Sequence, residues 1–137
     1  MNIVEEMELN LYPESQRSVL CDLLSYANKI ELNRLVLTTH SPYVINYLTL
    51  AAKAFLLTQK ISANETLQER IKEVVPADSA IDPARLRIYE LKDGGVFRLS
   101  TYEGLPSDEN FLNIQLGVTN ELFDQLLEIE QEFDYKN

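Results

Sequence analysis

The chain has 137 residues, enough for one domain with a buried core, and its hydrophobic share of 45% and charged share of 25% are ordinary for a globular protein. Its 22 acidic and 12 basic side chains give a formal net charge of −10, which argues against a nucleic-acid clamp because such domains are usually basic. A single cysteine, Cys21, excludes a disulfide framework, and no apolar run is long enough to span a membrane. We therefore expect a cytoplasmic protein that has no membrane partner and binds nucleic acid only through segments absent from this sequence.

Two short apolar runs alternate with two helical patterns before residue 61. Ile3 and Val4 are predicted to end one strand, and residues 35–37 form a second, buried strand. Apolar residues at helical spacing predict helices from Pro13 to about residue 29 and from Pro42 to about Gln59. Since parallel strands need such helical crossovers, this order predicts an α/β fold with a parallel sheet flanked by helices.

Acidic and hydroxyl side chains follow the two predicted strands. Glu5 and Glu6 come directly after the first strand, and Thr39, Ser41 and the only histidine, His40, follow the second. The carboxyl ends of parallel strands share one edge, so we expect these groups to converge there, with Glu6 and His40 within about 10 Å of each other. Neighbouring residues at a strand end point to opposite faces, so the two carboxylates should face different parts of that site. Two carboxylates and an imidazole suit hydrolysis of a Mg²⁺-bound nucleoside triphosphate.

The start of the second helix adds to this site. Ser41 before Pro42 is the pattern of an N-cap residue followed by proline at the first helical position, and a helix N-terminus favours phosphate. Each motif also has a simpler interpretation: Glu5 and Glu6 as a solvated acidic N-terminus, and His40 as a histidine that bridges a loop. The two motifs in this order favour a shared site.

Weaker patterns follow residue 60. Residues 65–75 predict a short helix, and residues 76–83 a loop. Residues 86–100 alternate around a glycine turn and predict an antiparallel hairpin that turns at Gly94-Gly95. The last helix is expected from about Thr119 to Phe133, with these apolar side chains on its buried side: Leu122, Phe123, Leu126, Leu127 and Phe133. We expect one domain over residues 1–137, made of a core (1–60), a helix and loop (61–83), and the hairpin with its closing helix (84–137).

Two segments carry a family resemblance. Residues 3–16 read Ile-Val-Glu-Glu-Met-Glu-Leu-Asn-Leu-Tyr-Pro-Glu-Ser-Gln, and residues 35–43 read Leu-Val-Leu-Thr-Thr-His-Ser-Pro-Tyr. Together they resemble the C-terminal half of an ABC-type ATPase head, and in particular the bacterial AAA-family ATPases of the OLD-like and RecF-like kind. In those proteins a Walker B strand ends in a Glu-Glu-Pro-Glu run, and a Thr-Thr-His-Ser-Pro segment carries a switch histidine. The resemblance implies a partial P-loop NTPase fold that binds and hydrolyses ATP with Mg²⁺.

By this resemblance each residue of the expected site receives a role. Glu5 matches the metal-side Walker B acid, Glu6 the catalytic glutamate and His40 the sensor of the γ-phosphate. Thr39 and Ser41 flank the histidine as nucleotide-binding residues. The hairpin and the closing helix resemble late elements of the same family more weakly.

The sequence also departs from the family pattern. Met7 stands where proline is usual, and Tyr12 where histidine is frequent. No Gly-x-x-x-x-Gly-Lys-Ser/Thr segment occurs, so the four glycines of the chain supply no P-loop cradle for a phosphate. We therefore expect a fragment of an ATPase, as a split subunit, a truncated product or an expressed piece, that works with a missing Walker A half or a partner subunit. The intact ATPase is expected to be a homodimer.

The sequence leaves three functions open. In the first, the chain supplies the Walker B acids and the switch histidine of an ATPase and is inert alone. In the second, it is a non-catalytic interaction or dimerisation module whose exposed sheet edge and apolar surface capture a partner. In the third, it is a self-sufficient metal hydrolase that uses Glu5, Glu6 and His40, and the single histidine makes this the weakest.

Overall fold

The computed structural model describes residues 1–136, without the side chains of residues 130, 132–134 and 136. It contains two compact units, Met1–Ser107 and Asp108–Asn137. Within residues 1–136, the first unit holds the six strands and the first three α-helices, and the second unit holds the last α-helix. Among the described residues, no helix is both long and apolar enough to cross a membrane.

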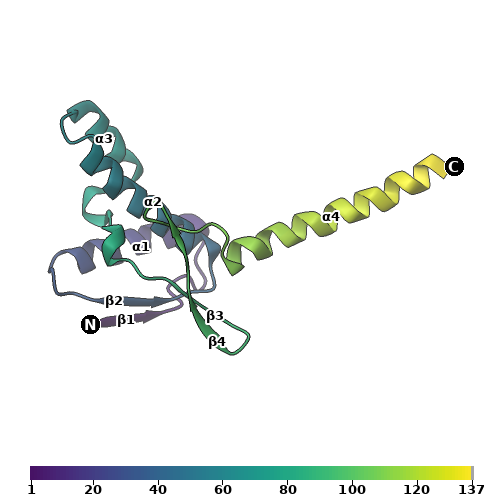
Figure 1. The fold of residues 1–137 in the computed structure, drawn as a ribbon, viewed down its shortest axis with the longest axis horizontal. Coiled ribbons are helices and arrows are strands. Elements are labelled where there is room, and N and C mark those ends of the chain that lie inside the picture. Colours follow the sequence, from purple (N-terminus) through teal and green to yellow (C-terminus); the bar gives the residue numbers. More distant parts are fainter. Residues whose placement is uncertain (137) are drawn as a thin grey trace. The chain divides into compact units, whose positions relative to one another are not determined.

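The first unit begins with a strand–helix–strand–helix segment, as predicted (Figure 1). Strand β1 (Asn2–Glu5) pairs in parallel with β2 (Leu35–Thr38), in a register that aligns Asn2 with Leu35 and Glu5 with Thr38. The 16-residue helix α1 (Pro13–Asn28) connects the two strands, and α2 (Pro42–Lys60) follows β2. Helices flank a small parallel sheet, so the predicted α/β class is confirmed.

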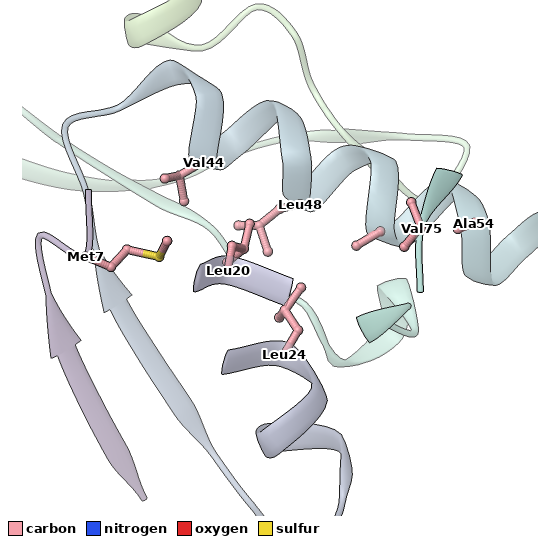
Figure 2. Close-up of a cluster of buried hydrophobic side chains, with 8 residues drawn as sticks. Met7, Leu20, Leu24, Val44, Leu48, Ala54 and Val75 are labelled. Atoms are coloured by element: carbon pink, nitrogen blue, oxygen red, sulfur yellow. The ribbon is translucent and has the colours of Figure 1, made fainter. Parts of the chain in front are cut away.

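The core lies between the inner face of the β1–β2 pair and helices α1 and α2. Side chains alternate between the two faces of the pair, so Val4 and Leu37 pack against the core while Ile3 and Val36 are exposed. Figure 2 shows Met7, just beyond β1, turned toward Leu20 of α1 and Val44 of α2. Met7 stands where the family resemblance implies a proline, and here its flexible thioether side chain is buried.

A short helix and two 3₁₀ turns follow α2. Helix α3 (Glu65–Val74) is confirmed, and the Asn64 side chain caps it by accepting a hydrogen bond from the Leu67 N–H at 3.0 Å. The turns η1 (Ala77–Ser79) and η2 (Pro83–Arg85) lie within and at the end of the predicted loop. This loop is held to α1, because the Asn28 amide donates to the carbonyls of Asp78 and Ala80 at 2.8 and 2.9 Å.

The predicted hairpin is present, but it turns one residue earlier than expected. Strands β3 (Tyr89–Lys92) and β4 (Gly95–Arg98) are antiparallel, and Gly95 pairs with Lys92. The two turn residues are therefore Asp93 and Gly94, with φ of 50° and 73°. This is the backbone of a type I′ turn, and aspartate tolerates the left-handed conformation well enough to take its first central position.

A second, smaller hairpin was not predicted. Strands β5 (Thr101–Tyr102) and β6 (Leu105–Pro106) pair around Glu103 and Gly104, which both have positive φ. Strands of two residues are too short to show alternation in a sequence, which is why residues 103–110 carry only the signal of a polar loop.

In the second unit, helix α4 spans Phe111–Lys136, so the predicted start at Thr119 was wrong. The Asn110 side chain accepts a hydrogen bond from the Asn113 N–H at 3.0 Å and caps the earlier start, and Gly117 lies inside the helix. Within this unit these side chains are exposed, and their expected burial stays a prediction: Leu122, Phe123, Leu126 and Leu127. A single helix offers no second layer within its own unit, and the Phe133 side chain lies outside the described atoms.

Removal of a core side chain should unfold the first unit more readily. Leu20→Ala leaves a cavity between α1, α2 and Met7, so the free energy of unfolding should fall by about 2–5 kcal/mol. Urea denaturation followed by circular dichroism measures this loss. The control is Leu32→Ala, which removes the same atoms from an exposed site and should change stability by no more than about 0.5 kcal/mol. Equal losses in the two variants would contradict this core.

Candidate functional site

Glu6 and His40 lie side by side just beyond the carboxyl ends of β1 and β2. The Nε2 atom of His40 is 3.3 Å from Oε1 of Glu6. The parallel register brings them together, because backbone pairing continues past β1 through a 2.9 Å hydrogen bond from the Glu6 N–H to the Thr38 carbonyl. The prediction that the two residues lie within about 10 Å is confirmed. The side chain of His40 is 84% exposed and that of Glu6 is 40% exposed, so a ligand in solution can reach both.

The backbone at Glu6 is in an unusual conformation. Its φ is +46°, in the left-handed region that costs a residue other than glycine about 1–3 kcal/mol and that is frequent at functional sites. The turn places Met7 in the core while Glu6 stays partly exposed. The strand thus ends at Glu5. Side chains alternate between faces only within a strand, so the predicted opposite orientation of Glu5 and Glu6 does not apply to Glu6.

Glu5 is exposed at the end of β1, opposite Thr38 in the register. Its oxygen donors and those of Glu6 are accessible and suit Mg²⁺, which usually takes one or two carboxylates and fills its other positions with water and substrate phosphates. A site formed wholly by protein ligands is a different case. Within the described part of the chain, no group of three or more histidine, cysteine, aspartate or glutamate residues is placed to hold a metal ion. The donor set therefore fits Mg²⁺ that arrives with a phosphate ligand.

Glu8 is the member of the site that sequence reasoning missed. Its Oε1 atom accepts hydrogen bonds from the Thr39 hydroxyl at 2.8 Å and from the backbone N–H of His40 at 2.6 Å. Burial is the largest single influence and raises the pKa of the Glu8 carboxyl, but the hydrogen bonds from His40 and Thr39, with smaller contributions, together leave the pKa below its ordinary value. The only signal in the sequence was the position of Glu8 as the third acid of a short acidic run.

Both hydroxyls next to His40 are engaged within the chain. The Thr39 hydroxyl donates to Glu8 and accepts the N–H of Ser41 at 2.9 Å. Ser41 is in the N-cap position of α2, but its side chain makes no capping bond, so this part of the prediction was wrong. Its hydroxyl instead donates to Oε1 of Gln16 on α1 at 2.6 Å, between two buried residues. The nucleotide-binding roles of Thr39 and Ser41 stay predictions.

The site residues lie within a segment that matches a known protein family. Residues 3–46 match the family model described as "AAA domain, putative AbiEii toxin, Type IV TA system". The matched segment runs from β1 into the first turns of α2 and includes Glu5, Glu6, Glu8 and residues 39–41. It supports an origin of this region in an AAA-type ATPase. No curated protein and no solved structure matches the chain.

Protonation of Glu8 should weaken the folded state in acid. The pKa of Glu8 is lower in the folded chain than its ordinary value of 4.5. The ionised side chain therefore contributes fully to the free energy of unfolding above pH 4.5, and this contribution is lost as the pH falls through the folded-state pKa. Glu8→Gln should therefore destabilise the chain at neutral pH, and this effect should shrink progressively as the pH falls below 4.5. Urea unfolding across this range measures the difference, with Glu73→Gln on α3 as the control for one lost exposed charge. An equal effect at both ends of the range would contradict the prediction.

Proposed function

We propose that the segment around residues 3–46 supplies the Walker B acids and the switch histidine of an ABC-type, ATP-hydrolysing AAA-family ATPase. The observation that carries this proposal is the 3.3 Å approach of His40 Nε2 to Glu6 Oε1 at the shared edge of two parallel strands. The family match over the same residues supports it independently. ATPases of this class use ATP with Mg²⁺, and both donor types that such a reaction needs, carboxylate and imidazole, are accessible here.

Each residue has a distinct role in this proposal. Glu5 would hold Mg²⁺, which when bound neutralises charge on the phosphates. The Glu6 carboxylate orients the attacking water and accepts its proton, and the His40 imidazole donates a hydrogen bond to the terminal phosphate. The Thr39 and Ser41 hydroxyls rank behind His40 as phosphate contacts, because a hydroxyl has a single O–H donor and theirs are directed at Glu8 and Gln16.

Hydrolysis in this proposal needs a second segment with a P-loop. Affinity for a triphosphate comes mainly from glycine-loop amides and the P-loop lysine, and the 137 residues contain no such motif. A net charge of −10 also repels a nucleotide of the same sign. We propose that a Walker A segment, in a partner subunit or elsewhere in a longer chain, completes the site, and that the completed ATPase acts as a homodimer.

The 137-residue chain alone should not turn ATP over. Calorimetry with Mg²⁺ and ATP should show weak or no binding, and a phosphate-release assay should show no turnover above background. With a P-loop segment added, for example from an in-frame upstream reading frame, hydrolysis should appear. Glu6→Gln should then lower its rate by about 10²–10⁴-fold, because general-base catalysis contributes that much, while nucleotide binding stays within about twofold. Micromolar ATP binding with Glu6-dependent turnover by the chain alone would contradict the need for a second segment.

A second candidate function is supported by the outer face of the β1–β2 pair. Ile3 and Val36 are partners in the register and are 59% and 43% exposed, and within residues 1–136 no third strand pairs with either β1 or β2. Parallel sheets are usually covered on both faces. The exposed face therefore favours an interaction or dimerisation module, whether or not the ATPase site is active.

If this face mediates self-association, a charge on it should prevent dimer formation. Val36→Asp places a carboxylate at the centre of the face and should weaken association by at least about tenfold, since burial of an unpaired charge opposes binding. Sedimentation velocity of the wild-type and variant chains over a range of concentrations measures this. Val96→Asp, on an exposed position of β4, is the matched control and should leave association unchanged. A wild-type chain that stays monomeric throughout would exclude dimerisation through this face.

A further inference from the structure

We propose that Glu8 is a positioning residue that fixes the backbone of residues 39–41 so that the His40 imidazole faces Glu6. This inference rests on the proposed function, because the orientation of His40 matters for catalysis only if the imidazole contacts a phosphate. The geometry on which it depends, however, exists in the chain without nucleotide and is tested there.

One carboxylate oxygen organises three consecutive residues. Oε1 of Glu8 accepts the His40 N–H at 2.6 Å and the Thr39 hydroxyl at 2.8 Å. The same Thr39 hydroxyl accepts the Ser41 N–H at 2.9 Å, so the whole segment between β2 and α2 is linked to Glu8. Hydrogen bonds to an ionised acceptor are shorter and about twice as strong as neutral ones, which makes this the dominant local restraint on the segment.

The His40 side chain needs such a restraint because packing does not supply one. It is 84% exposed, and its close polar partner is Glu6 at 3.3 Å. An exposed imidazole samples its rotamers freely unless its backbone is fixed in an orientation that favours one of them. The Glu8 bond to the His40 N–H fixes the backbone directly at the residue that carries the imidazole.

Glu8 is itself held from the core side. It follows Met7, which is buried against α1 and α2, and it comes two residues after the left-handed turn at Glu6. Its second oxygen, Oε2, is buried and accepts no hydrogen bond from the described residues. Because Oε2 is buried and Oε1 already accepts two hydrogen bonds, Glu8 is poorly placed to bind a metal or activate water. The three acids thus have two different roles in this proposal: Glu5 and Glu6 contact the ligand, and Glu8 fixes the backbone of His40.

NMR spectroscopy of the full 137-residue chain tests this role. The wild type should give an NOE between the His40 ring and the Glu6 side chain and slow exchange of the His40 amide proton. In Glu8→Ala the NOE should disappear and exchange of that amide should become at least about tenfold faster, while NOEs between Met7 and Leu20 persist. Glu8→Gln retains an acceptor oxygen and should preserve the NOE. Glu73→Ala on α3 is the control and should change neither signal.

A ring NOE that persists in a folded Glu8→Ala chain would overturn the proposal and leave Glu8 with a role in stability only. If Glu8→Ala does not fold, Glu8→Asp takes its place: the shorter side chain should weaken the NOE, and an unchanged NOE would again overturn the proposal. These signals do not depend on ATP, so they distinguish this inference from the proposed function. In an assembled, active ATPase, Glu8→Ala should lower kcat by about tenfold and leave KM for ATP within about twofold, because an orienting residue acts mainly in the transition state.

Discussion

Parallel pairing of β1 with β2 is the constraint on which the candidate site depends. The register aligns Glu5 with Thr38, so the residues that follow the two strands begin at the same level of the sheet. A shift of the register by one residue would turn the core side chain of the strand that slips, Val4 or Leu37, away from the core, so burial of both side chains also fixes the site. The short distance between Glu6 and His40 is thus a consequence of the packing of the strands against α1 and α2.

A small set of hydrogen bonds then fixes the position of the segment that follows β2. The Ser41–Gln16 hydrogen bond joins the start of α2 to α1, and the Glu8 bonds join the turn after β1 to the segment after β2. The Ser41–Gln16 bond is buried, so loss of either partner would leave a polar group without a hydrogen bond and cost about 1–3 kcal/mol. The Glu5 and His40 side chains are exposed and that of Glu6 is partly exposed, and these three are the ones proposed to meet the ligand.

Both proposed functions bring a second surface against the first unit. Within residues 1–136 its parallel sheet has two strands and an exposed apolar face, and the 137-residue sequence contains acids and an imidazole but no P-loop motif. Electrostatic stabilisation of a triphosphate needs preorganised donors on several sides, and this chain offers them from one side only. The proposed ATPase needs a Walker A segment as its second surface, and the proposed interaction module needs a partner on its exposed sheet face.

The sequence by itself determined the local elements and the approximate place of the site. Helical periodicity predicted α1 and α2, the order of apolar runs predicted the parallel sheet, and the motifs after each run predicted that Glu6 and His40 converge. The start of α4, the exact hairpin turn and the second hairpin were beyond local patterns, because each is decided by a cap or by one or two residues with positive φ. The partners of Thr39 and Ser41, and the role of Glu8, were decided only by tertiary structure. Hydrogen bonds between residues 25 to 32 positions apart leave no periodic signal in the sequence and exist only after packing has brought the segments together.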